Sequence, residues 1–229
     1  MLPCFAGQLI EKMRGAMKNS LNFLCKFMVN GIILGGMLGL VSCAGSGESS
    51  VTTLSLLKDG SVRSEIRENF GESYYDSTEL QNTILSQTAD YNREAGSSKI
   101  TVEKVEARDD IAVVKMIYEK PEDYASFNRS ILFVGTAKEA KEAGYQLDLV
   151  LSGTKDANET IGMSDMLAME GEKLLITDVK DLIVLNGKAL YTSDNVTVSD
   201  NGKEIQISLS GEEGKEAGDK KALAYVVFE

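Results

Sequence analysis

Residues 76–118 read DSTELQNTILSQTADYNREAGSSKITVEKVEARDDIAVVKMIY, and this stretch decides the fold class. Its first part predicts a helix over about 77–95, because apolar residues recur along one stripe. Asp76 can cap that helix, and Glu79, three residues later, completes a capping-box pattern. Gly96 is well placed to end it. The stripe consists of Leu80, Ile84, Leu85, Thr88, Tyr91 and Ala95.

Two strands are predicted after this helix. Ile100, Val102 and Val105 mark the first strand. Residues 111–118 form the second and are apolar on both faces, as expected of a central strand. Arg108-Asp109-Asp110 supplies the turn between them.

The flanking sequence adds a hairpin and two short helices. Residues 52–57 and 62–67 are β-type runs around Asp59-Gly60, a strong hairpin signal because glycine accepts positive φ. Pro121 can open a short helix. Thr136 and Glu139 form a capping box for a second short helix that ends at Gly144.

The helical signal fades after about residue 146. Asn186-Gly187 and Asn201-Gly202 are typical of hairpin turns. Ile205 and Ile207 alternate with polar residues, so their strand has one wet face. Short β-type runs recur at 146–151, 173–177, 182–185, 188–191, 196–199, 204–209 and 222–228, and an exposed loop is expected at 211–221.

The predicted fold class is therefore α+β. An α+β subdomain is expected over 52–150, followed by a β-rich subdomain over 151–229. Residues 43–51 are small and polar and predict a flexible tether.

Residues 1–42 are predicted to be a targeting segment rather than part of the fold. Lys18 and Lys26 precede an uncharged, mainly apolar run of 15 residues over 27–41, which is short for a membrane span of roughly 20 residues. The run ends Leu40-Val41-Ser42-Cys43-Ala44, which resembles the lipobox of bacterial lipoproteins. That resemblance implies cleavage between Ser42 and Cys43, and a diacylglycerol, with palmitate-type acyl chains, on the Cys43 sulfur.

Composition excludes several kinds of chemistry. The chain has no histidine, which removes Ser-His and Cys-His nucleophile pairs and most transition-metal sites. From Cys43 onward, 20 Lys and Arg face 34 Asp and Glu, a net charge of −14. So acidic a surface argues against nucleic acid as a partner. We expect no cofactor, no metal and no disulfide.

Acidic pairs leave one route to catalysis open. Two carboxylates can hydrolyse a glycosidic bond without histidine, although the required separation is spatial and cannot be predicted from sequence. Asp109-Asp110, Asp178 with Asp181, and Asp194 with Asp200 could also lend oxygens to calcium. Solvated turns are the simpler interpretation of such pairs in so acidic a chain.

Aromatic residues crowd the first half of the chain. Tyr74 and Tyr75 stand in a predicted loop just before the long helix, and Tyr124 and Phe127 lie in the first short helix. Such rings can form a surface for sugars or peptides. The favoured alternative is that these rings cover the core.

Several stretches together resemble a family of lipoproteins from Gram-positive, clostridia-like bacteria. They are Cys43-Ala44-Gly45, Ser73-Tyr74-Tyr75-Asp76, and residues 123–128, 132–136 and 225–229. The resemblance implies a host and a location at the outer face of the cell membrane, but no activity.

The leading functional hypothesis is a non-enzymatic binding or interaction protein of the cell envelope, anchored to the membrane through lipid on Cys43. Its partner would be an envelope protein, a peptide or a glycan. One alternative is a carboxylate-dependent glycan hydrolase. Another is the solute-binding component of a transporter, although βα alternation, which such proteins usually show, is missing.

Overall fold

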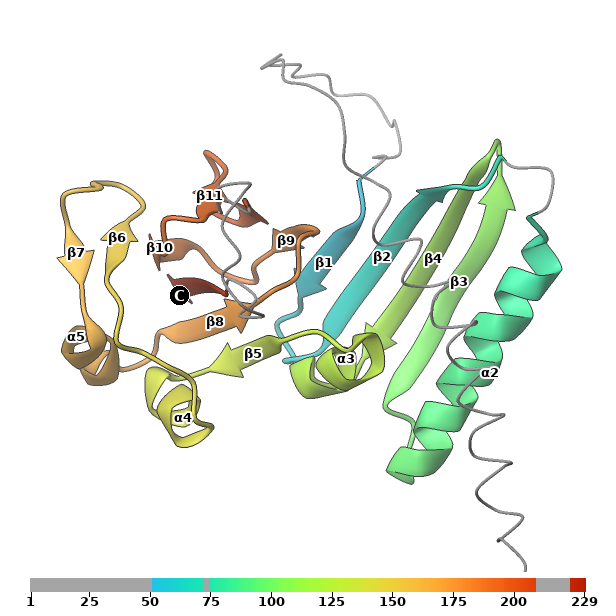
Figure 1. The fold of residues 1–229 in the computed structure, drawn as a ribbon, viewed down its shortest axis with the longest axis horizontal. Helices are drawn as coiled ribbons and strands as arrows, with labels where there is room; N and C mark the ends of the chain where they lie inside the picture. Colours follow the sequence, from blue (N-terminus) through green and yellow to red (C-terminus); the bar gives the residue numbers. More distant parts are fainter. Residues whose placement is uncertain (1–50, 72–74, 209–222) are drawn as a thin grey trace, which may run out of the picture.

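The computed structural model describes residues 51–71, 75–208 and 223–229 (Figure 1). The predicted signal segment, Ser42 and Cys43, the tether up to residue 50, Tyr74 and the loop at 211–221 lie outside the described residues.

The described chain is an α+β structure with a majority of strands, which confirms the predicted fold class. The first of its two sheets has the strand order β11-β12-β9-β1-β2-β4-β3. Its neighbours are antiparallel except for the parallel pair of β1 and β9. Its strands are β1 (Thr53–Leu56), β2 (Val62–Asn69), β3 (Ile100–Arg108), β4 (Ile111–Tyr118), β9 (Leu182–Val184), β11 (Val196–Val198) and β12 (Glu204–Ile207).

The second sheet is antiparallel throughout and has the order β5-β8-β13-β10-β6-β7. Its strands are β5 (Leu132–Gly135), β6 (Leu151–Gly153), β7 (Thr160–Ile161), β8 (Lys173–Thr177), β10 (Ala189–Thr192) and β13 (Ala224–Phe228). The helices are α2 (Ser77–Ala95), α3 (Pro121–Asn128), α4 (Ala137–Glu142) and α5 (Met163–Ala168). Both sheets take strands from either side of residue 150, so hydrogen bonds join the two halves of the chain.

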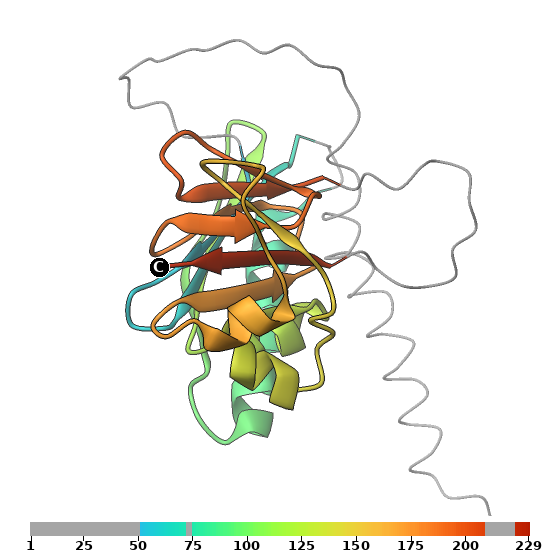
Figure 2. The same cartoon turned by 90° about the vertical axis from the view of Figure 1, so that its left-hand side faces the viewer.

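The second sheet is buried on both faces. Val226 and Phe228 of β13 join the core shared with the first sheet, α2 and α3. Tyr225 and Val227, which point the opposite way, join a separate core with α4 and α5. Figure 2 shows α4 and α5 lying over this second face.

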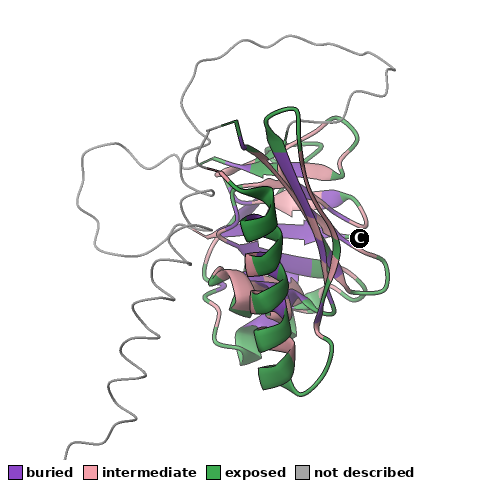
Figure 3. Cartoon of the chain, turned by 90° about the vertical axis from the view of Figure 1, so that its right-hand side faces the viewer, coloured by how far each residue is buried: buried purple, intermediate pink, exposed green. Residues whose placement is uncertain are grey.

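Local signals predicted α2 correctly. The Asp76 carboxylate accepts the backbone N–H groups of Thr78 at 2.7 Å and Glu79 at 3.1 Å. Gly96 ends the helix with φ of 71°. The expected stripe is wrong at Leu85, which is 46% exposed, and at Ala95, which is also exposed, because only the narrower row that contains Leu80, Ile84 and Thr88 is buried. Figure 3 shows the exposed outer side of this helix.

The hairpin predicted at Asn186-Gly187 is wrong. β9 and β10 belong to different sheets, so the chain crosses between sheets at this point. Asn186 donates its side-chain amide to the carbonyl of Leu57 at 3.0 Å, which holds the crossing against the β1–β2 turn. A Cβ on Gly187 would overlap the backbone oxygen of Glu229, so glycine is required here by close backbone approach.

Two further predictions in the second half need correction. The strand expected at 146–151 begins only at Leu151, because the N–H of Leu149 bonds the carbonyl of Leu147 at 2.9 Å and turns the backbone. α5 and β7 were not predicted, since each is too short to show a hydrophobic period. The hairpins at Asp59-Gly60 and Asn201-Gly202 are confirmed.

Candidate functional site

The structure separates the aromatic residues singled out in the sequence. Tyr124 is 3% exposed and packs edge-on against Tyr118, with ring centroids 5.0 Å apart. Phe127, half-buried on the same helix, packs edge-on against Tyr91 at 5.7 Å. Tyr75 lies elsewhere, stacked on Phe70 with centroids 4.7 Å apart and planes 14° from parallel. Tyr124 and Phe127 therefore form part of an aromatic cluster, and Tyr75 belongs to a different place in the fold.

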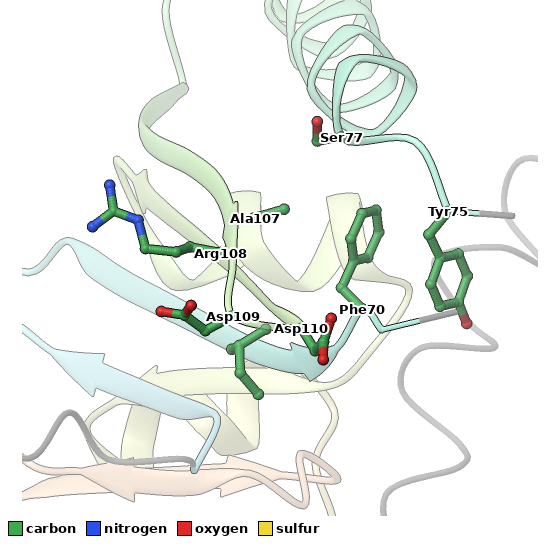
Figure 4. Close-up of a pocket in the computed structure, with 8 residues that line it drawn as sticks. Phe70, Tyr75, Ser77, Ala107, Arg108, Asp109 and Asp110 are labelled. Carbon is green, nitrogen blue, oxygen red and sulfur yellow. The ribbon is translucent and has the colours of Figure 1, made fainter. Parts of the chain in front are cut away.

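Tyr75 borders an open pocket of about 290 Å³ at one end of the first sheet, which we call the hollow. Its wall is made where β2 ends, α2 begins and the β3–β4 turn reverses the chain (Figure 4). Its volume is at the small end of the range for ligand pockets. The lining residues are Phe70, Tyr75, Ser77, Ala107, Arg108, Asp109, Asp110 and Ile111.

The backbone fixes the acidic side of the hollow. Asp109 and Asp110 adopt φ of 52° and 63°, a left-handed pair that closes the tight turn between β3 and β4. The N–H of Phe70 donates to the carbonyl of Asp110 at 2.7 Å, which extends the β2–β4 ladder by one bond beyond Asn69. A Cβ on Gly71 would lie 3.0 Å from the Asp110 side chain, so the carboxylate is packed close against the chain that follows Phe70.

Charges around the hollow are predominantly acidic. Arg108 pairs with Glu106 at 3.1 Å, and Figure 4 shows its side chain pointing away from the two rings. Among the ion pairs between described residues, none includes Asp109 or Asp110. Both carboxylates are exposed, so they present negative charge beside an aromatic wall.

The face of the first sheet that carries Arg63, Glu65 and Arg67 has its charges paired, unlike the acidic side of the hollow. Glu65 accepts Arg67 at 2.6 Å and Lys115 at 2.8 Å, and Arg63 pairs with Glu103 at 3.3 Å. Burial raises the pKa of Glu65, but the bonds from Lys115 and Arg67 outweigh it and lower this pKa overall. Charges on that face are therefore largely matched within the protein.

A second pair of carboxylates lies near the same end of the first sheet. Asp181 immediately precedes β9, two residues before the fully buried Ile183, so it points toward the inner face. Burial raises the pKa of Asp181. Burial also raises the pKa of Glu68, near the end of β2, and the negative charge of Asp181 adds to the effect.

The described residues contain no group of three or more His, Cys, Asp or Glu side chains placed to hold a metal ion. The acidic pairs singled out in the sequence as possible oxygen donors to calcium are Asp109-Asp110, Asp178 with Asp181, and Asp194 with Asp200, for which solvated turns are the simpler interpretation. Asp178 instead accepts the backbone N–H of Ile131 at 2.7 Å.

Sequence reasoning missed the combination of residues that forms the hollow. The sequence shows Phe70 as an aromatic residue and Asp109-Asp110 as a turn. No local pattern predicts that they lie side by side in the fold. The one local cue was the pair of turn-forming acids, Asp109 and Asp110, directly before the most apolar strand. Nothing in the sequence indicated that Phe70, which is only 9% exposed, would lie beside them.

Among the described residues, no helix combines the length and the apolar character that crossing a bilayer requires. Comparisons with family models, with curated proteins and with solved structures returned no significant match.

Proposed function

We propose that the chain is a non-enzymatic binding protein of the bacterial cell envelope, anchored at the extracytoplasmic face of the cell membrane through lipid on Cys43. The hollow is its recognition site, and an envelope protein, a peptide or a glycan is its partner. The observation that carries the binding role is the stacked pair of Phe70 and Tyr75 beside the exposed carboxylates of Asp109 and Asp110. Anchoring is supported by the lipobox-like sequence that ends at Cys43.

The chemistry of the hollow supports binding better than catalysis. Aromatic faces provide apolar contact area at low entropic cost, and the adjacent carboxylates provide orientation. Asp109 and Asp110 are consecutive residues of one turn, whereas glycoside hydrolysis uses two carboxylates on opposite sides of the bond to be cleaved.

One observation favours the alternative of a glycan hydrolase. Glu68 and Asp181 come from different elements and both have raised pKa values, as a general acid must. This reading predicts slow hydrolysis of wall glycan that Glu68→Gln and Asp181→Asn each abolish. Hydrolysis that survives both substitutions, or that never occurs, removes the alternative. The hypothesis of a solute-binding transporter component gains no support, because its βα alternation would give parallel sheets and both sheets here are largely antiparallel.

Anchoring has a direct test. Replacing Cys43 with Ser removes the thiol that would carry the lipid, so the variant should leave the membrane fraction and lose the lipid mass increment. A wild-type chain without lipid, together with a Cys43→Ser chain that stays on the membrane, would disprove the anchor.

Binding is tested by a thermal-shift screen of the purified chain in detergent against wall fragments, oligosaccharides and peptides. A ligand at a hundred times its Kd stabilises by about 2.7 kcal/mol. That is a shift of several degrees, at roughly 2–4 °C per kcal/mol for a chain of this size.

The same screen is repeated with a matched pair of variants. Tyr75→Ser should remove the shift, and Tyr191→Ser, which alters a tyrosine of β10 in the second sheet, should keep it. Equal loss in both variants would contradict recognition at the hollow.

A further inference from the structure

We infer that the hollow faces the membrane and docks a lysine- or arginine-rich segment of a second protein in that membrane. The inference rests on the proposed anchoring at Cys43 and names the partner that the hollow would take. Four observations carry it: where the chain enters the first sheet, how far Cys43 lies from that point, the charge of this end, and the shape of the hollow.

The chain enters the described structure at the end of the sheet that holds the hollow. Thr53 pairs with Glu65 of the neighbouring strand. One residue earlier, the Thr52 hydroxyl donates to the carbonyl of Arg67 and accepts the N–H of the same residue. Phe70 stands three residues beyond Arg67, roughly 10 Å farther along the strand direction. Figure 1 shows the start of β1, the end of β2, the β3–β4 turn and the start of α2 at one end of the molecule.

Chain length limits how far this end can be from the lipid. Eight peptide units join Cys43 to Val51, and a chain of that length spans at most about 29 Å whatever its conformation. Lys58, in the β1–β2 turn, lies at the opposite end of β2, an eight-residue strand that extends roughly 25 Å. Because the tether joins the fold at the hollow end, that end stays within the tether's length of the membrane, whereas Lys58 can lie roughly 25 Å farther away. We therefore place the hollow on the membrane side and Lys58 on the far side.

The charge of the hollow end selects the partner. Asp109 and Asp110 are exposed, Glu68 and Asp181 lie near the same end, and Arg108 is paired with Glu106. Anionic headgroups repel such a surface, whereas a basic segment is attracted to it over about 10 Å at moderate salt. The net charge of −14 from Cys43 onward strengthens this selection.

The shape of the hollow fits a long basic side chain. The methylene stem of Lys or Arg can lie along the Phe70–Tyr75 wall while its head reaches the carboxylates of the turn. A volume of about 290 Å³ suits one such side chain and its immediate surroundings rather than a large compound.

The partner chemistry is tested by titrating the purified chain with a fluorescent hexalysine peptide. The double variant Asp109→Asn/Asp110→Asn keeps the turn, because asparagine adopts positive φ readily. It should weaken binding about tenfold, since charge complementarity is lost. The control Asp194→Asn/Asp200→Asn removes the same charge from two exposed loop residues elsewhere and should leave the affinity unchanged.

Three results of this titration would overturn the inference. If both double variants lose the same amount of affinity for hexalysine, the peptide would be attracted by the net charge of the protein alone and not by the hollow. Free lysine that competes as well as hexalysine would mean a small amine ligand instead of a segment. If phosphatidylglycerol vesicles bind instead of hexalysine, and the Asp109→Asn/Asp110→Asn variant loses that binding, the ligand of the hollow would be a lipid surface and not a protein segment.

The orientation is tested on lipidated protein in vesicles that contain a quencher at the headgroup depth. A dye is attached at Ile111→Cys in the hollow or at Lys58→Cys at the far end, both exposed positions. Cys4 and Cys25 lie in the predicted signal segment and Cys43 carries the lipid, so the introduced thiol is the free one in the processed chain.

We expect stronger quenching of the dye at residue 111 than at residue 58. Equal quenching, or stronger quenching at residue 58, on a firmly anchored chain overturns the orientation and leaves the anchoring proposal intact. A chain that does not associate with vesicles at all overturns both proposals.

Discussion

Thr52 and Arg67 are joined through a single hydroxyl. The Thr52 Oγ1 donates to the carbonyl of Arg67 at 3.3 Å and accepts the backbone N–H of Arg67 at 3.1 Å. The side chain thus continues the β1–β2 ladder one position past the start of β1. These two bonds fix where the chain enters the first sheet. Their partner, Arg67, lies three residues before Phe70, which lines the hollow.

Replacing Thr52 with Val removes both bonds and keeps the shape of the side chain. We expect a loss of about 1–2 kcal/mol in the free energy of unfolding, because two half-buried backbone groups lose their partner. Urea denaturation measures this loss. Thr101→Val, at an exposed position of β3, is the control and should stay within about 0.5 kcal/mol of the wild type.

Asn92 provides a second test of side-chain to backbone bonding. Its Oδ1 accepts the N–H groups of Lys99 at 2.8 Å and Ile100 at 2.9 Å, and its Nδ2 donates to the carbonyl of Ile100 at 2.8 Å. Asn92→Ala should cost about 2 kcal/mol or more, because three bonds that hold the start of β3 against α2 disappear. Asn82→Ala, on the exposed side of the same helix, should cost much less; similar losses in both variants would show that these bonds contribute little.

Gly187 should tolerate no side chain. A Cβ there would overlap the backbone oxygen of Glu229, so Gly187→Ala must displace the residue that follows β13 or move the crossing between the sheets. We expect a loss of at least about 2 kcal/mol, as in other overpacked sites. Lys188→Ala, at the exposed next residue, is the control for the same turn. A fully stable Gly187→Ala chain would contradict the close approach.

Glu68 and Asp181 should make the protein less stable as pH rises. Burial raises the pKa of both carboxyl groups in the folded state, and for Glu68 the charge of Asp181 raises it further. Between the ordinary pKa and the raised folded pKa, the native state binds more protons than the unfolded state. The free energy of unfolding therefore falls as pH increases through that window.

Asp181→Asn should remove the contribution of Asp181 to this dependence and reduce the contribution of Glu68, which keeps the part caused by its own burial. The variant is expected to unfold at a higher urea concentration than the wild type at neutral pH. The difference should shrink as pH falls to the ordinary range of aspartate, where the wild-type group is protonated in both states. Asp194→Asn, at an exposed loop position, is the control. A difference between wild type and Asp181→Asn that does not change with pH would contradict the assignment.

Elements whose signals lie within a few residues were predicted well. Asp76 and Gly96 bound α2 as expected, and Thr136 with Glu139 forms the predicted capping box, with the Thr136 N–H donating to the Glu139 carboxylate at 2.7 Å. These features depend on backbone conformation and on bonds between near neighbours. A local sequence therefore contains all the information that they need.

The sheet assignments could not be predicted in the same way. Asn186-Gly187 has the composition of a hairpin turn, yet it connects two sheets. Its glycine is required because the backbone of Glu229, the residue after β13, approaches closely. The parallel pairing of β1 with β9 joins segments far apart in the chain. Which strands pair depends on the burial of whole faces, a property of the complete core and not of any short segment.

By itself, the sequence determined the α+β class, the ends of the long helix, three of the hairpins and the acidic character of the chain. Only the tertiary structure decided that Tyr75 stacks on Phe70 beside Asp109-Asp110, while Tyr124 and Phe127 pack in a separate aromatic cluster. The physical reason is distance along the chain. A helix cap forms between residues three apart, whereas the hollow forms where strand pairing brings the end of β2, the start of α2 and the β3–β4 turn to one end of the first sheet.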